Sequence, residues 1–135
     1  MNIMSARDGL KQWHATVANQ DMSILSELLD DDVVFYSPVV HSPQEGKAIT
    51  AMYLAGASKV LGNDAFEYVR EIVDGNNAML EFTTVIDGIT INGVDIIRFS
   101  DAGRIVEFKV MVRPLKAINL VHQKMGEMLQ QLAGQ

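Results

Sequence analysis

The sequence contains no cysteine, only three prolines and no strongly basic segment. Without cysteine, the chain can form no disulfide, thiolate nucleophile or cysteine-based metal site. No apolar run approaches the roughly 18 residues of a membrane-spanning helix, so no membrane association is expected. The 11 basic residues are outnumbered by 17 acidic ones, which gives a formal net charge of −6. A nucleic-acid partner is not expected either, because binding to phosphates requires a positive surface.

Signals for secretion and for metal binding are also missing. The N-terminus carries Arg7 and Asp8 but no apolar core of a secretion signal, so we expect a cytoplasmic protein. The histidines His14, His41 and His122 are scattered and lack the i,i+4 spacing of a helical zinc pair. We therefore expect neither a metal nor another cofactor.

The length and composition fit one globular domain covering residues 1–135, with 48% hydrophobic and 21% charged residues. We expect a core at about 6–113 and a C-terminal helix at 115–132. The periodicity of apolar residues predicts helices at 6–19, 23–29, from an entry at 42–45 to about 61, and 115–132, and strands at 33–36, 66–73, 78–86, 89–99 and 104–112.

The order of these elements predicts an α+β fold shaped like a cone. A long curved antiparallel sheet would wrap around the N-terminal helices, and an extra helix would follow at the C-terminus. Turn signals at 87–88 and 101–103 favour hairpins between the last three strands. The C-terminal helix has an apolar stripe that must pack against its own subunit or a partner. The stripe, with His122 on the same line, consists of Leu115, Ile118, Met125, Leu129 and Leu132.

Asp95 stands alone in the otherwise apolar strand segment 93–99. An ionised carboxylate is costly to bury, so it raises its pKa, finds a partner or faces a wet cavity. Strand alternation places Asp95 on the same face as Ile97. Two roles are open: a structural acid bonded to Trp13 or Tyr53, or a functional group in a pocket.

The same alternation predicts the pocket wall. Inward-facing residues of three strands would give it an apolar character, which suits a small hydrophobic ligand with one carbonyl or hydroxyl group. A cone filled by its own side chains is the alternative. The predicted wall residues are Leu80, Phe82, Thr84, Ile97, Phe108, Val110 and Val112.

The order of elements resembles that of the SnoaL-like families of the NTF2-like superfamily. The similarity covers about 6–113 and is carried by a helix, acidic turn, strand and proline unit, and by the segments 94–99 (VDIIRF) and 101–106 (DAGRIV). It implies the cone fold described above. The superfamily contains isomerases, cyclases, dehydratases and inactive proteins, so the fold alone does not imply one activity.

Ketosteroid isomerases are the most useful comparison within this superfamily, because one of their segments reads IDVMRF. The resemblance places their oxyanion-donor aspartate at Asp95 and a supporting tyrosine at Tyr53. It places their oxyanion tyrosine at Trp13 and their general base at Ser37. The serine hydroxyl has no acidity useful for shuttling a proton between carbons unless another group activates it, and indole donates a hydrogen bond without exchanging protons. His41, in a nearby loop, is the best replacement base or else a solvated residue.

Three functions therefore remain open. The first is binding of a small hydrophobic carbonyl or hydroxyl compound, with isomerase- or cyclase-like chemistry in which Asp95 stabilises an oxyanion or acts as an acid. Trp13, Ser37 and Tyr53 would then contact the ligand. The second is a non-catalytic binding or accessory protein, favoured by the altered residues at positions 13 and 37. The third is an interaction module that uses the outer sheet face and the C-terminal helix.

The resemblance also implies a homodimer formed through the convex face of the sheet. The residues on this face support the same expectation, because several of them are apolar although no element of the chain is predicted to cover them. These residues are Thr83, Val85, Val94, Ile96 and Met111.

Overall fold

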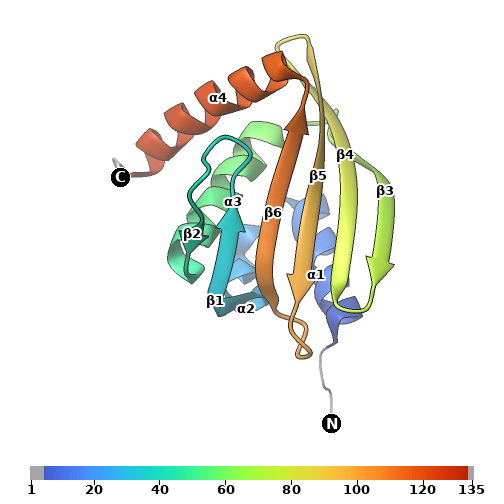
Figure 1. Cartoon of the computed structure of the whole chain (residues 1–135). Coiled ribbons are helices and arrows are strands. Elements are labelled where there is room, and N and C mark those ends of the chain that lie inside the picture. Colours follow the sequence, from blue (N-terminus) through green and yellow to red (C-terminus); the bar gives the residue numbers. More distant parts are fainter. Residues whose placement is uncertain (1–4, 134–135) are drawn as a thin grey trace.

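The computed structural model describes residues 5–133 and shows a curved six-stranded sheet with helices on one face (Figure 1). Helices α1, α2 and α3 lie against the inner face, and α4 crosses one end of the sheet (Figure 1). The α+β plan with an extra C-terminal helix is therefore confirmed. The helices are α1 (Ala6–Asn19), α2 (Leu25–Leu28), α3 (Lys47–Leu61) and α4 (Leu115–Ala133), and the strands are β1 (Leu29–Tyr36), β2 (Gln44–Glu45), β3 (Glu67–Asp74), β4 (Asn77–Ile86), β5 (Ile89–Phe99) and β6 (Ile105–Arg113).

The sheet has the order β2-β1-β6-β5-β4-β3 and does not close into a barrel. Hairpins join the strands from β3 to β6, and each of these neighbouring pairs is antiparallel. The pair β1·β6 departs from the expected antiparallel arrangement, because it is parallel. No hairpin links these two strands, so the chain is free to place them in the same direction.

Local signals explain most element boundaries. The helix α1 begins at a capping box in which Ser5 and Asp8 satisfy each other's backbone N–H groups. At the predicted hairpin between β4 and β5, Asp87 and Gly88 both have positive φ, at 51° and 77°. Two positive φ values are typical of the type I′ turn that matches the twist of the flanking strands.

Three predicted boundaries around β1 and α3 are wrong. The expected helix at 23–29 divides into a 3₁₀ turn (Met22–Ile24) and α2, and β1 already begins at Leu29. Leu29 pairs with Ile105, so the three following aspartates lie in a strand rather than in a break. The expected helix entry at 42–45 contains β2, which pairs with β1, and α3 starts only after Gly46.

The apolar stripe predicted for α4 is shifted. Leu115 is 73% exposed and His122 is exposed, whereas Ala117, Val121 and Met125 form the buried line. The side chain of Leu132 lies outside the described part of the chain. Met125 belongs to the predicted stripe, and Ile118 and Leu129 of that stripe are half-buried, so the buried face overlaps the predicted one and is rotated away from Leu115 and His122.

The closeness of α3 explains which face of α4 is buried. A Cβ atom on Gly56 of α3 would lie 3.4 Å from Cε of Met125 and 3.5 Å from Cγ of Met128. The small residue therefore lets α4 approach closely at the level of these two methionines. Because α4 packs there, it covers one end of the cone rather than extending into solvent.

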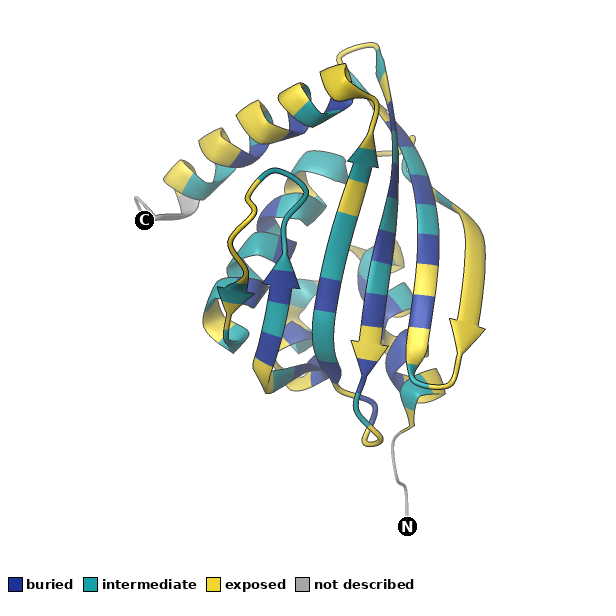
Figure 2. Ribbon diagram, in the orientation of Figure 1, coloured by how far each residue is buried: buried dark blue, intermediate teal, exposed yellow. Residues whose placement is uncertain are grey.

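Buried residues alternate with more exposed ones along β5, as Figure 2 shows. The inward residues belong to two apolar clusters: one is built around α1, α2 and the lower sheet, and the other around α4 and the upper sheet. The first contains Leu10, Trp13 and Phe108, and the second contains Phe82 and Val121. The boundary between these clusters is where the candidate site lies.

The outer face of the sheet carries apolar side chains that none of the described helices covers (Figure 1). Ile72, Met79 and Met111 are 54%, 41% and 50% exposed. Val94 and Ile96, which pair with Met111 and Met79 respectively on neighbouring strands, are partly exposed. Within residues 5–133, no helix is long and apolar enough to cross a membrane.

Candidate ligand-binding site

A cavity of about 90 Å³ lies between the inner face of the sheet and helices α1, α3 and α4. A single water needs only about 10–15 Å³ of such space, so the cavity can admit a small molecule. Its wall is predominantly aromatic and aliphatic, which favours an apolar ligand. The aromatic members of the wall are Trp13, Phe35, Tyr53, Phe66, Tyr68, Phe82 and Phe108.

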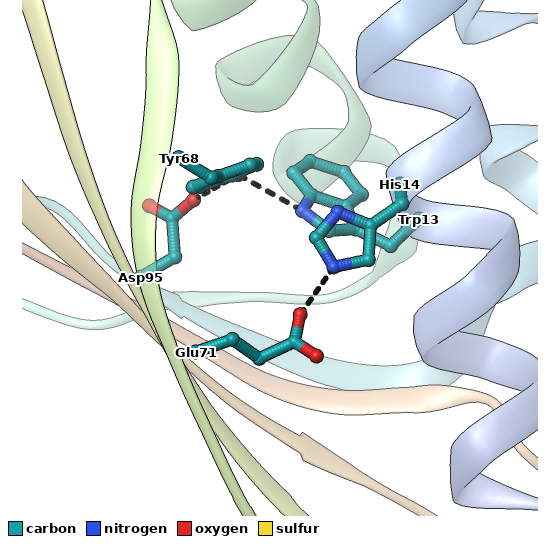
Figure 3. A network of polar contacts seen from close by, with 5 residues as sticks. All are labelled: Trp13, His14, Tyr68, Glu71 and Asp95. Atoms are coloured by element: carbon teal, nitrogen blue, oxygen red, sulfur yellow. Dashed lines mark hydrogen bonds and ion pairs between the residues drawn. The ribbon is translucent and has the colours of Figure 1, made fainter.

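Asp95 is the one carboxylic acid in this wall, among the described residues. Strand β5 turns it inward, and only 6% of its surface is exposed. The hydroxyl of Tyr68, on β3, donates a hydrogen bond of 2.6 Å to Oδ2 of Asp95 (Figure 3). The indole Nε1–H of Trp13, on α1, in turn donates to the Tyr68 oxygen over 3.1 Å.

The direction of this hydrogen-bond chain follows from the chemistry of its first member. An indole nitrogen can only donate, so Tyr68 accepts from Trp13 and has its own hydrogen left for Asp95. Oδ2 of Asp95 is therefore the final acceptor. No hydrogen bond to Oδ1 occurs within residues 5–133, and a proton taken up by Asp95 would be held at Oδ1.

Burial raises the pKa of Asp95 to about 7, and the hydrogen bond from Tyr68 lowers it in part. The pKa of Tyr68 is raised far above its ordinary value, first by burial and then by the charge of Asp95. Tyr68 therefore stays protonated, and Asp95 changes its charge near neutral pH. Such a group can donate a hydrogen bond from Oδ1 when protonated and accept one when ionised.

A second polar pair lies beside this chain (Figure 3). Nε2 of His14, on α1, contacts Oε1 of Glu71, on β3, and the His14 ring packs edge-on against Tyr68 with centroids 5.5 Å apart. Both side chains of the ion pair are more than a third exposed, so the pair itself stabilises the fold little. Its effect is to hold α1 and β3 together next to Tyr68.

Most residues predicted for the site do meet at this cavity. They come from α1, the end of β1, α3 and the inner face of the sheet, which are distant in sequence. The predicted residues that line the cavity are Trp13, Ser37, Tyr53, Phe82, Asp95, Phe108, Val110 and Val112.

Four predicted residues lie elsewhere. Leu80 and Ile97 are fully buried in the lower apolar cluster and do not line the cavity, although Leu80 pairs with Asp95 across β4 and β5. Thr84 is buried near the opposite end of β4, where its hydroxyl donates to Asn63 over 2.8 Å. His41 is exposed in the loop between β1 and β2 and does not line the cavity. Strand alternation identifies the inward face but not which of the inward side chains reach the cavity.

Tyr68 is the functional candidate that sequence reasoning missed. The predicted partners of Asp95 were Trp13 and Tyr53, whereas Tyr68 stands between Asp95 and Trp13. Two features of the sequence point to Tyr68: the strand signal at 66–73, and the position of this tyrosine on the inward face of that strand. Ser58 of α3 and Val121 of α4 also line the cavity without having been predicted.

The cone, the aromatic cavity and the inward aspartate agree with one family. The model of the SnoaL-like domain matches residues 10–108 of the chain. The chain is a SnoaL-like domain. No curated protein matches this SnoaL-like domain in sequence.

Solved structures support the same assignment. A crystal structure of a steroid delta-isomerase from Pseudomonas aeruginosa is 37% identical, with a TM-score of 0.91, and the match covers 96% of this chain and 95% of that chain. An uncharacterised protein with a cystatin-like fold from Silicibacter pomeroyi is 28% identical, with a TM-score of 0.81 and coverage of 88% and 83%. An NTF2-like protein of unknown function from Mesorhizobium loti shares the fold at 20% identity, with a TM-score of 0.70 and coverage of 81% and 91%.

Proposed function

We propose that this SnoaL-like domain binds a small apolar molecule with a carbonyl or hydroxyl group, and that Asp95 bonds the ligand oxygen. One observation carries the proposal: Tyr68 holds Oδ2 of Asp95, while Oδ1 of this cavity-lining residue has no partner within residues 5–133. Oδ1 is not among the fully buried unpaired atoms of the described residues, so it is accessible from the cavity, and a ligand oxygen that meets it there can form a hydrogen bond in predominantly apolar surroundings.

Isomerase- or cyclase-like chemistry is a further part of this proposal. Protonated Asp95 would donate from Oδ1 to an oxygen on which negative charge develops, in a cavity with a predominantly apolar wall. The similar crystal structure named a steroid delta-isomerase supports this reaction type. The role of Asp95 would be that of oxyanion donor or acid.

Binding without catalysis is the second candidate. It is favoured by the two altered positions, because the Trp13 N–H is already donated to Tyr68 and Ser37 has no useful acidity. The two candidates differ in whether protons on the ligand move. Exchange of the α-protons of cyclohexanone for deuterium in D₂O, followed by NMR, separates them: faster exchange with the protein indicates catalysis.

Binding itself is tested with cyclohexanone and the size-matched apolar methylcyclohexane. In an NMR titration, the wild-type chain should prefer the ketone relative to an Asp95→Leu variant, and Asp95→Asn should retain the preference because an amide still donates. Val110→Trp should abolish binding of both molecules by filling the cavity. An unchanged preference in Asp95→Leu would contradict the role of Asp95.

We also propose a homodimer formed through the outer face of the sheet. The exposed apolar residues on β3, β4 and β6 support it, as does the mixed charge beside them, where Arg70 and Glu81 form an ion pair. A patch that carries both signs of charge can meet its own copy around a twofold axis. A stable contact of this kind buries at least roughly 1,000 Å² in total.

A further inference from the structure

Ser37 and Asp95 occupy matching positions on either side of one residue of β6. In the parallel pair β1·β6, Phe35 faces Phe108 and Tyr36 faces Lys109. β1 ends at Tyr36, and continuing its register by one residue sets Ser37 level with Val110. On the other side of β6, Val110 pairs with Asp95. Neighbouring strands are about 4.8 Å apart, so the backbones at positions 37 and 95 are roughly 10 Å apart.

The side chain of Ser37 belongs to the inner face. Phe35 is buried in the core, and Lys109 lies over the Tyr36 ring on the opposite side of the sheet. The next residue in the alternation, Ser37, therefore turns inward, and it lines the cavity together with Val110. A row of three residues, Ser37, Val110 and Asp95, thus crosses the cavity wall.

The hydroxyl of Ser37 can still donate one hydrogen bond. Its oxygen accepts the backbone N–H of Val39 over 3.2 Å, which stabilises the turn after β1. Across the described residues, no acceptor is found for its hydrogen. Ser37 can therefore donate to a ligand oxygen without giving up its role in the turn.

We infer that Ser37 is a second ligand-contacting residue, and that the ligand is an apolar molecule with two oxygens placed at opposite ends. This inference rests on the proposed function, in which the first oxygen meets Asp95. Both side chains stand on the inner face of a curved sheet and reach into the same cavity, with Val110 between them in the row. Each group therefore approaches the ligand from its own side of Val110, and a ligand with one oxygen on each side gives both groups a hydrogen-bond partner.

Two six-membered ring ketones provide the test. In 4-hydroxycyclohexanone a hydroxyl lies opposite the carbonyl, and in 4-methylcyclohexanone a methyl group of similar size replaces it. The quantity measured is the ratio of their dissociation constants, from NMR titrations of the full chain. A single hydrogen bond changes affinity by about two- to tenfold, so Ser37→Ala should shift this ratio against the hydroxy ketone by that factor.

Three variants distinguish a ligand contact from a change in the turn. Ser37→Thr retains the hydroxyl and should restore the wild-type ratio, whereas Ser42→Ala, an exposed serine of the same loop, should leave it unchanged. Ser58→Ala removes the other serine of the cavity wall and should not reproduce the effect. A damaged turn would weaken both ketones equally.

The inference is overturned if Ser37→Ala leaves the ratio unchanged, or if Ser58→Ala rather than Ser37→Ala shifts it. Failure of the proposed function has a different signature. In that case Asp95→Leu would leave the dissociation constants of both ketones unchanged, whatever the effect of the substitutions at position 37.

Discussion

Trp13 and Asp95 are connected through a single atom, the phenolic oxygen of Tyr68, which accepts from the indole and donates to the carboxylate. The contact joins α1, β3 and β5, three elements that are separated in sequence. Because indole has no acceptor, the two hydrogen bonds cannot reverse together. Trp13 does not touch Asp95, yet its hydrogen bond directs the Tyr68 hydroxyl to Oδ2, which leaves Oδ1 without a partner among the described residues.

Replacing Tyr68 with phenylalanine should raise the pKa of Asp95 further above about 7. The Tyr68 hydroxyl favours the ionised carboxylate, and its loss leaves burial as the dominant cause. Carbon-detected NMR of the side-chain carboxyl across the pH range gives the value. The matched variant Tyr53→Phe removes another cavity hydroxyl that does not bond Asp95, and it should leave the titration in place. A lowered value in Tyr68→Phe would contradict the assigned hydrogen bond.

Asp95→Asn should stabilise the fold at pH 8 more than at pH 5. The folded state holds the Asp95 proton up to about pH 7, whereas an unfolded chain releases it near 3.8, so wild-type stability falls as pH rises between these values. The full difference amounts to about 4 kcal/mol, and asparagine avoids it while still accepting from Tyr68. Urea unfolding at both pH values measures the effect. An equal change at pH 5 and pH 8 would show that Asp95 titrates normally.

Ile96→Glu should convert the proposed dimer into a monomer. The substitution places an unpaired charge within the apolar outer face, next to Met79, and a buried charge without a partner opposes association. Light scattering at micromolar concentration distinguishes the two states. Val40→Glu, at a 37% exposed position in the loop after β1, should leave the assembly intact. A wild-type chain that is monomeric at this concentration would contradict the proposed dimer.

Two glycine substitutions should have opposite effects on stability. A Cβ atom at Gly93 would clash with the Phe82 ring and lie 2.9 Å from the Met111 carbonyl oxygen, so Gly93→Ala should cost about 1–3 kcal/mol. At Gly126, in α4, nothing lies within 4 Å, and alanine should add about 0.5–1 kcal/mol through its helix propensity. Thermal unfolding of both variants measures the difference. Equal effects would argue against the close packing of β5 on Phe82.

The sheet could be predicted well where its signals are local. The alternation of β5 and the turn at Asp87 and Gly88 identify both the strand and the inward direction of Asp95. The parallel pair β1·β6 has no such signal, because it depends on how the intervening helix and hairpins return the chain. Which inward side chains of β4 and β5 reach the cavity depends on how distant elements pack against them, so alternation alone places Leu80 and Ile97 in a wall from which they are absent.

The sequence predicts the carboxylate of the site, Asp95, but it does not predict the hydrogen-bond network around this residue. An isolated acid in an apolar strand is visible in one segment of sequence, but the partner of Asp95 depends on the pairing of β3 with β4. That pairing contains a register shift between Tyr68 and Arg70. The buried face of α4 likewise depends on where Gly56 of α3 admits another helix, which no spacing within α4 reveals.

The parallel pairing of β1 with β6 has a consequence for the order of folding. Residue 29 meets residue 105, so the central part of the sheet requires the closure of a long loop, and such contacts slow folding. During synthesis the N-terminal helices and β1 leave the ribosome long before their neighbour in the sheet does. Until β6 emerges, the edge of β1 that pairs with β6 in the complete sheet has no partner strand. Val33 and Phe35, which are buried in the complete fold, then lie on a strand with one open edge. The nascent chain is therefore most exposed to aggregation late in its synthesis, immediately before the strand that completes the sheet.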